Sequence, residues 1–144
     1  MTDMSNIESQ YPKCGVVVLV LKDGKALLGK RMGAHGANTF AFPGGKLEWD
    51  ESFADCAKRE TREEAGIEIG NIRFLRLLNF KAYGKHFVDI GLVADWVAGE
   101  PKIMEPEKCA GWEWHGLDKM PEPLFNGCQS CIDAYKGGVN YIDA

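Results

Sequence analysis

Apolar and polar residues alternate along much of this chain in short runs that are typical of β-strands. Residues 14–31, CGVVVLVLKDGKALLGKR, contain two β-branched and aliphatic runs separated by KDGK, so we expect a β-hairpin. A Gly-rich loop then leads into a short strand through Phe42, which Pro43 ends. Residues 72–83 and 85–99 predict two longer strands that pair antiparallel.

One helix is predicted in the middle of the chain. The segment 52–65 has Phe53, Ala54, Ala57 and Thr61 at the three- and four-residue spacing of one helix face. Ser52 is a suitable N-cap, Asp55 lies three residues later, and Gly66 follows the last turn. The remaining segments are a proline-bearing connector at 100–111, a short strand at 112–117 and a closing helix at 124–136. Because the regular strand–helix alternation of a doubly wound fold is missing, we expect an α+β domain, layered α-β-α around a mixed sheet.

The composition limits the class of protein. The chain has 144 residues, 45% of them hydrophobic, which fits one domain over residues 1–144 with a polar leader at 1–12. The net charge of −4 argues against binding polymeric nucleic acid, so an anionic substrate would need a local positive centre such as a metal ion. No apolar run approaches the roughly 20 residues that cross a membrane, and no signal peptide is recognisable.

Cysteine usage indicates a reducing, cytoplasmic setting. The five cysteines are an odd number without the dense spacing of a disulfide framework. Cys128 and Cys131 form a C-x-x-C pair, but no second pair completes a four-ligand metal site. We therefore expect them to be two small apolar residues on the closing helix.

The predicted central helix carries a cluster of carboxylates. Glu60, Glu63 and Glu64 project together, because positions three and four apart share a helix face. A solvated face whose acids pair with neighbouring lysine and arginine residues is the simpler interpretation. The preceding FPGGKLE turn instead favours a site for Mg²⁺ or Mn²⁺, which prefer carboxylate and carbonyl oxygens. Glu51 lies near the helix start, and Arg59 is placed to reach back and orient an acid.

These residues resemble the signature of the Nudix hydrolases, G-x5-E-x7-R-E-U-x-E-E-x-G-U, in which U is a bulky aliphatic residue. The matching positions are Gly45, Glu51, Arg59, Glu60, Glu63, Glu64, Gly66 and Ile67. Thr61 stands where an aliphatic residue is expected, and we expect this β-branched side chain to face the core. The resemblance extends from about Gly15 to Phe125 through LLGKR, FAFPGGKLE, EPEK, GWEW and PLF. These segments recur in that order in the MutT-like branch, which includes plant and human hydrolases of oxidised or modified purine nucleoside triphosphates.

The resemblance implies an α-β-α sandwich and magnesium-dependent hydrolysis of a nucleoside diphosphate linked to another group, with Mn²⁺ as a substitute metal. In this branch it implies a nucleoside monophosphate and pyrophosphate as products, after in-line attack by a water that a carboxylate deprotonates. By position, Arg59 orients the acids, while Glu51 matches the first signature glutamate, whose role differs among members. The family often adds one acid from a distant loop, for which Glu107 is our first choice and Glu105 the second. The implied metal ligands are Gly45, Glu60, Glu63, Glu64 and Glu107.

Substrate recognition is predicted around the signature. Lys46 and Arg31 are placed to hold phosphates, although each also fits a surface charge. The other expected substrate-binding residues are Phe42, Gly44, Phe87, Asp89, Leu124, Phe125 and Asn126. Asp89 shares a strand face with Phe87, where a carboxylate needs a hydrogen-bond donor. That donor is either a purine N–H or a structural partner from the backbone or a lysine.

Three departures from the branch leave the base open. Asn126 stands where relatives commonly carry an aromatic residue, Lys46 where they tend to have histidine, and Asp89 where they have a different residue. Alternative substrates are NADH, a nucleotide sugar or a prenyl diphosphate, and a non-catalytic nucleotide-binding module is the alternative outside enzymes. The acidic net charge counts against caps on long RNA. The resembling branch often forms a symmetric homodimer, for which WEWHGL and the long strands would supply apolar surface.

Overall fold

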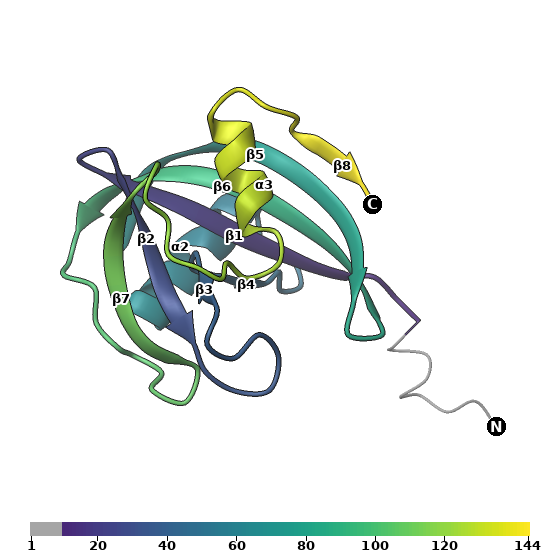
Figure 1. The fold of residues 1–144 in the computed structure, drawn as a ribbon, viewed down its shortest axis with the longest axis horizontal. Coiled ribbons are helices and arrows are strands. Elements are labelled where there is room, and N and C mark those ends of the chain that lie inside the picture. The colour runs from purple at the N-terminus through teal and green to yellow at the C-terminus, as the bar shows by residue number, and fades with distance from the viewer. Residues whose placement is uncertain (1–9) are drawn as a thin grey trace.

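The computed structural model describes residues 10–144, so most of the expected leader lies outside the described part. A mixed sheet lies between two helices (Figure 1). In chain order the elements are β1 Lys13–Lys22, β2 Lys25–Arg31, β3 Phe40–Ala41, β4 Gly44–Lys46, α2 Phe53–Ala65, β5 Glu68–Ala82, β6 Lys85–Ala98, β7 Cys109–Gly116, α3 Cys128–Tyr135 and β8 Tyr141–Asp143.

The sheet divides where β1 and β2 separate. The described strands follow the order β3-β2-β1-β6-β5-β8, with β4 added to β1 and β7 added to β2. The two strands of the first hairpin pair only beside their turn, at Leu21 with Ala26 and Lys22 with Lys25. Beyond that point β1 pairs with β4, and β2 pairs antiparallel with β7. The separation opens a cleft between the two parts of the sheet. Because β1 also pairs parallel with β6, the sheet is mixed, as the sequence predicted.

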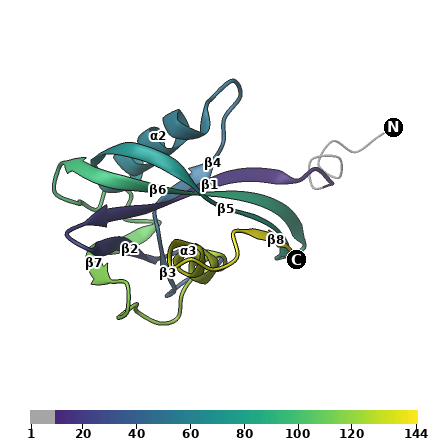
Figure 2. The ribbon, with the colours of Figure 1, turned by 90° about the horizontal axis from the view of Figure 1, so that it is seen from above.

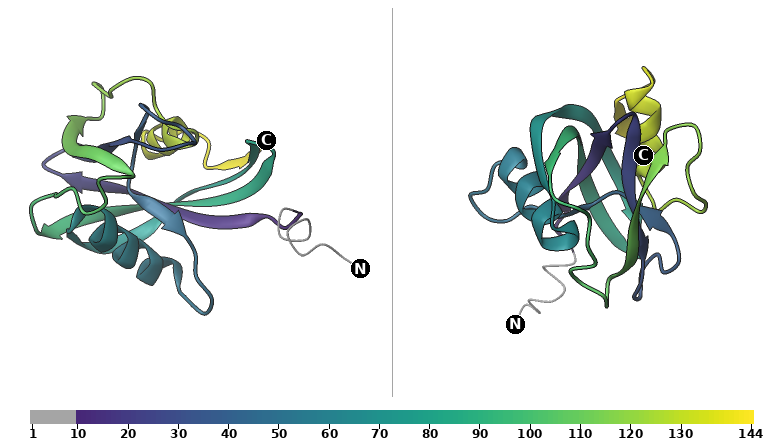
Figure 3. Two further views of the ribbon diagram at one scale, coloured as in Figure 1. Left: turned by 90° about the horizontal axis from the view of Figure 1, so that it is seen from below. Right: turned by 90° about the vertical axis from the view of Figure 1, so that its left-hand side faces the viewer.

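Helices α2 and α3 cover opposite faces of the sheet (Figures 2 and 3). On one face, Val16, Val18 and Val20 of β1 pack in one core with Ala57 and Ala65 of α2. On the other face, Leu19 and Val93 pack against Cys131 and Ile132 of α3. The α-β-α layering expected from the sequence is therefore confirmed.

The central helix agrees closely with its sequence signals. The Ser52 side chain accepts a hydrogen bond from the Asp55 backbone N–H at 3.0 Å, and Gly66 ends the helix in the left-handed conformation with φ of 69°. Thr61 is fully buried, and its hydroxyl donates to the backbone oxygen of Ala57 at 2.9 Å. Phe53 departs from the expected pattern, because it is 47% exposed.

Elements that depend on distant pairing differ from the predictions. Gly44–Lys46 is strand β4 rather than only a turn, because it pairs with the edge of β1. Strand β8 had no predicted counterpart, and it pairs parallel with β5 at Leu77–Asn79. The strand predicted at 72–83 begins earlier, at Glu68, whereas the closing helix predicted at 124–136 begins later, at Cys128.

The closing helix keeps its two cysteines in the core, as expected. Cys128 and Cys131 are buried, and all five cysteines of the chain are free. Burial raises the pKa of the Cys128 thiol to about 11 and that of Cys131 to about 12. Neither has the lowered pKa of a reactive thiol. Within residues 10–144, none of the helices has the length and apolar character that crossing a membrane requires.

Candidate active site

A cleft of about 710 Å³ opens where β1 and β2 separate. It runs from the carboxylates of α2 on one side of the sheet to Asp89 of β6, whose side chain lies on the α3 side. The predicted site residues in its wall are Arg31, Phe42, Gly44, Gly45, Lys46, Glu60, Glu63, Glu64, Phe87, Asp89, Glu105, Glu107, Phe125 and Asn126. The fold therefore brings most of the predicted residues to one cavity.

Three predicted residues lie outside this wall. Glu51 and Arg59 lie behind the carboxylates, where they contact each other. Leu124, which we expected in the base pocket, instead forms a bridge with Phe40 and packs against the core beneath α3. Phe125, the next residue after Leu124, lies in the cavity wall, whereas Leu124 does not.

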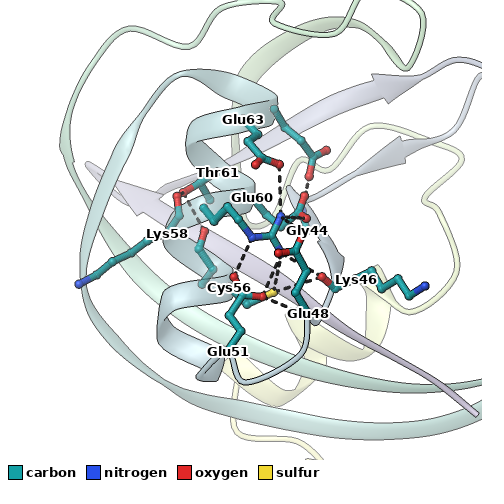
Figure 4. Close-up of polar contacts among 12 residues, drawn as sticks. Gly44, Lys46, Glu48, Glu51, Cys56, Lys58, Glu60, Thr61 and Glu63 are labelled. Carbon is teal, nitrogen blue, oxygen red and sulfur yellow. Dashed lines mark hydrogen bonds and ion pairs between the residues drawn. The ribbon is translucent and has the colours of Figure 1, made fainter.

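Arg59 connects the acids of the signature helix (Figure 4). Its Nε and Nη2 donate to the two oxygens of Glu51 at 2.7 and 3.0 Å, the bidentate geometry that favours arginine over lysine. Nη1 donates to Glu60 at 2.7 Å and to Glu63 at 3.2 Å, and Nη2 also donates to the backbone oxygen of Lys46 at 3.0 Å. The hydrogen bond from Arg59 lowers the pKa of Glu51 to about 2. One guanidinium thus fixes three carboxylates and the end of strand β4.

Glu64 occupies a different environment on the same helix. Its Oε1 accepts the backbone N–H of Gly44 at 3.0 Å, and Arg59 makes no contact with it among the hydrogen bonds of residues 10–144. Burial raises the pKa of Glu64 to about 8, with further contributions from Glu60 and Glu105, while the Gly44 hydrogen bond opposes the shift. Glu64 is therefore an acid whose charge the surrounding protein does not neutralise.

Glycine is required at position 45 by the neighbouring acid. A Cβ atom added to Gly45 would overlap the carboxyl group of Glu60. The side chain of Glu60 therefore lies directly against the backbone of β4. This contact holds the Glu60 carboxylate against the β4 backbone in the wall of the cleft.

The donor set fits a hard divalent cation. Glu60, Glu63 and Glu64 supply carboxylate oxygens and Gly45 a carbonyl, the ligand types that Mg²⁺ prefers. Burial raises the pKa of Glu64 and the nearby Glu60 and Glu105 raise it further, so a cation bound there would favour the charged form of this acid. In residues 10–144 no three acid, histidine or cysteine side chains already form a metal-binding group, and Arg59 instead binds oxygens of Glu60 and Glu63. Binding a cation there requires these side chains to turn from the arginine.

The two acids of the distant loop lie in the cleft wall in different settings. Glu105 is half-buried, contacts the Lys108 ammonium at 3.4 Å, and contributes to the raised pKa of Glu64. Glu107 is exposed. The structure brings both to the cavity, and the electrostatic influence on Glu64 comes from Glu105, our second choice.

The opposite end of the cleft is aromatic and basic. The Arg31 guanidinium lies 3.9 Å from the centre of the Phe125 ring and donates to the backbone oxygen of His35. The His35 ring lies 4.6 Å from that of Tyr83, so the loop after β2 meets the β5–β6 turn. Our sequence interpretation did not single out His35 or Tyr83, because the contact joins two loops 48 positions apart.

The structural partner of Asp89 is an arginine. The fully buried Arg76 of β5 donates to Asp89 Oδ2 at 2.8 Å, whereas we had considered a backbone or lysine donor. A charged residue within the apolar run FLRLL, diagonally across from an acid on the next strand, is the signal that could have identified it. Burial raises the pKa of Asp89, and the charge of Arg76 opposes that shift.

Comparisons with known proteins agree with this geometry. A family model described as "NUDIX domain" matches residues 12–133. "Oxidized purine nucleoside triphosphate hydrolase" of Mus musculus is 32% identical over 107 residues, which cover 73% of this chain and 67% of that protein. "NAD-capped RNA hydrolase NudC" of Pseudomonas aeruginosa (strain LESB58) is 29% identical over 114 residues, which cover 78% of this chain. The match spans only 40% of that relative's length.

A solved structure extends the similarity to the backbone. The crystal structure of a MutT NUDIX hydrolase from Burkholderia pseudomallei superimposes with a TM-score of 0.82 at 31% sequence identity. The match covers 87% of this chain and 98% of that one. The layered mixed sheet described above is therefore similar to the fold of that protein over most of its length.

Proposed function

The chain belongs to the Nudix hydrolase family, and on that premise we propose that it hydrolyses purine nucleoside triphosphates, such as dGTP or 8-oxo-dGTP, to a nucleoside monophosphate and pyrophosphate. The observation that carries the proposal is the cluster of Glu60, Glu63 and Glu64 against the Gly44–Gly45 backbone, at one end of an aromatic cleft. The expected role of the enzyme is to clear such nucleotides from the cellular pool.

The phosphate end is the carboxylate end of the cleft. Glu60, Glu63, Glu64 and the Gly45 carbonyl would hold Mg²⁺, or Mn²⁺ in its place, with Glu107 or Glu105 as the additional acid. A metal held by these residues would supply positive charge to the phosphate oxygens and make a nearby water easier to deprotonate. Arg59 holds Glu60 and Glu63 in the metal-free protein, and both would turn from it to bind the cation, while its bidentate contact with Glu51 anchors the guanidinium behind them.

The protein's own groups then act on the substrate. Arg31 and Lys46 lie in the cleft wall, where their positive charges are available to the polyphosphate. Glu64 lies in the same wall, and its deprotonated form, with the pKa raised to about 8, would be basic enough to accept a proton from a water. Glu105, which is close enough to influence Glu64, is the other acid placed for that proton.

The nucleoside end is the aromatic end. Phe42, Phe87 and Phe125 line the cleft, and flat apolar rings suit a planar base. The mouse relative, named for oxidised purine nucleoside triphosphates, supports a purine. The relatives named for NAD-capped RNA match this chain over 40–45% of their length, and NADH is therefore the comparison substrate for any test.

Pyrophosphate release tests the proposal. We would compare dGTP, 8-oxo-dGTP, the other deoxynucleoside triphosphates, NADH and a nucleotide sugar, with Mg²⁺, for the wild type, Glu64→Gln and Glu68→Gln. Glu68 pairs with Arg62 on the exposed end of the helix region, outside the cleft wall, so it is a matched control for removing one carboxylate charge. We expect turnover of one purine triphosphate that Glu64→Gln loses and Glu68→Gln keeps.

Three results would count against the proposal. Turnover of NADH or the nucleotide sugar in place of every triphosphate would assign a different diphosphate. Equal activity of both variants would remove Glu64 from the reaction. Nucleotide binding without any turnover, followed by tryptophan fluorescence, would support the non-catalytic module instead.

The cellular setting and the assembly stay predictions. The five free cysteines support a reducing cytoplasm. A symmetric homodimer is expected from the resemblance, and light scattering of the purified protein would give the mass to compare with the 15.9 kDa chain.

A further inference from the structure

At the nucleoside end of the cleft, Asp89 of the wall forms an ion pair with the buried Arg76 behind it. The Arg76 side chain is fully buried, and its guanidinium makes four hydrogen bonds. Two go to Asp89, from Nη1 to the backbone oxygen and from Nη2 to Oδ2, each at 2.8 Å. The others go from Nε to Ser130 Oγ and from Nη2 to the Gly127 backbone oxygen, each at 2.9 Å. A buried charge is tolerated when it is paired and hydrogen-bonded in this way.

Two neighbouring glycines leave the space that this ion pair occupies. The stem of Arg76 crosses Gly91, where an added Cβ would come within 3.1 Å of Arg76 Cγ. At Gly127, which has φ of 90°, a Cβ would come within 3.0 Å of Arg76 Nη2 and 3.5 Å of Asp89 Oδ2. Arg76 thus fixes Asp89 on β6 relative to the segment that carries Asn126.

Arg76 occupies only one oxygen of the carboxylate. Asp89 is 21% exposed, and it lines both the main cleft and an adjoining recess of about 130 Å³. Among residues 10–144 the hydrogen bonds to its side chain end on Oδ2. Oδ1 faces Gly15, where an added Cβ would lie 3.6 Å away, and Gly15 is itself part of the cleft wall. An acceptor with no donor of its own is therefore presented beside the aromatic residues Phe87 and Phe125.

We propose that Asp89 is the specificity-determining hydrogen-bond acceptor for a ring N–H of the base, as at N1 of guanine, and that Arg76 is its positioning residue. The proposal rests on the proposed function, since it assigns the base preference of that same cleft. A base with N1–H places a donor opposite Oδ1, whereas adenine, whose N1 is an acceptor, leaves two acceptors facing each other.

The ion pair also sets the orientation that an asparagine side chain would take at position 89. In Asp89→Asn the amide oxygen must remain opposite the donating Arg76, because the alternative rotamer would set two donors against each other. The amide nitrogen would then occupy the place of Oδ1 and face the cleft. The substitution would convert an acceptor into a donor at nearly constant shape, and it would favour a base whose N1 accepts.

The experiment measures base preference in two independent ways. One is the ratio of kcat/KM for dGTP and dITP to that for dATP. The other is the ratio of dissociation constants for dGMP and dAMP with Mg²⁺, which needs no turnover. We expect the wild type to prefer guanine and hypoxanthine, and Asp89→Asn to lower this preference at least tenfold by both measures, with most of the loss in KM.

Asp95→Asn is the matched control. Asp95 lies on the same strand and pairs with Arg73 of β5 at 3.3 Å, but this pair is exposed and outside the cleft. The same chemical change there should leave the preference unaltered. Arg76→Lys keeps the positive charge but loses the guanidinium geometry, so it should reduce the preference while Asp89 is still present. A merely structural role for Arg76 would lower the folded fraction and affect all substrates equally.

The results separate this inference from the proposed function. If the wild type hydrolyses no triphosphate but binds dGMP over dAMP, and Asp89→Asn reduces that preference, the activity is wrong and the base assignment stands. An unchanged ratio in Asp89→Asn overturns the inference, whether or not the enzyme turns over triphosphates. An equal change in Asp95→Asn overturns it too, because the effect would then follow from charge and not from the cleft.

Discussion

Replacing Gly45 with alanine tests the geometry of the carboxylate end most directly. The added Cβ would overlap the carboxyl group of Glu60, which must move away. Gly45 is not among the glycines with positive φ, so alanine meets no backbone strain there. The atoms that must move are the far end of a flexible side chain. The substitution should therefore displace one acid and leave the fold intact.

The magnitudes predict a separation of activity from stability. Moving Glu60 breaks its 2.7 Å contact with Arg59, a partly exposed pair that contributes about 0.2–1 kcal/mol. Alanine in place of glycine stabilises the folded state by about 0.4–1 kcal/mol, because it restricts the unfolded chain. The two effects oppose each other, so the free energy of unfolding should change by less than about 1 kcal/mol. Altering even the partners of metal ligands costs about 10–100-fold in affinity or activity. Displacing a ligand should lower kcat/KM at least about 100-fold, which corresponds to about 2.7 kcal/mol of transition-state stabilisation.

Two further glycines provide the comparison. At Gly116 an added Cβ meets nothing within 4 Å, so Gly116→Ala should keep both activity and stability. At Gly44 the Cβ would overlap the backbone oxygen of Val16, so Gly44→Ala should lower both. Pyrophosphate release and urea unfolding would be measured for all three variants. Full activity of Gly45→Ala would refute the reasoning, because the position of Glu60 against β4 would then be irrelevant to the reaction.

Two other predictions concern titrating groups. Because the pKa of Glu64 is raised from 4.5 to about 8 in the folded protein, it favours folding fully below about pH 4.5, and this contribution is lost as pH rises to about 8. The metal-free protein should therefore have a lower Tm at pH 8.5 than at pH 6, and the difference should be smaller in Glu64→Gln. Mg²⁺ should raise Tm more at pH 8.5 than at pH 6, because a metal ligand must be deprotonated. Equal Tm differences between the two pH values in wild type and variant would contradict this. The second prediction concerns the thiols, of which Cys14 is exposed and the other four are buried. A thiol reagent should modify one cysteine rapidly in the native protein and all five after denaturation. Rapid labelling of Cys131 in the native protein would show instead that α3 opens readily.

The predictable part of the site is the part whose geometry is local. The residues from Gly45 to Gly66 include one helix, its two caps and the turn before it, and each has a signal a few positions away in the chain. Helical spacing alone places Glu60, Glu63 and Glu64 together. Arg59 was placed to reach Glu51 by the same reasoning, and the two are in bidentate contact.

The nucleoside end was less predictable because it depends on strand register. Which arginine can reach Asp89 is set by irregularities in the β5–β6 pairing, which shifts register between Phe74 and Arg76 and leaves Arg76 diagonal to Asp89. A shift of one residue would turn Arg76 to the other face of the sheet and leave Asp89 without its partner. Leu124 was misplaced for a related reason, since its bridge to Phe40 joins segments far apart in the chain.

Gly15 shows how the two ends are brought into one site. A Cβ at this residue of β1 would lie 3.3 Å from the Gly45 carbonyl oxygen and 3.6 Å from Asp89 Oδ1. The proposed metal ligand on β4 and the proposed base acceptor on β6 therefore lie on either side of one residue without a side chain. This is possible because β1 pairs with β4 on one edge and with β6 on the other, at Gly15 opposite both Lys46 and Asp89. The separation of β1 from β2 thus does more than open a cleft, since it makes room for β4 and so sets the phosphate end beside the base end.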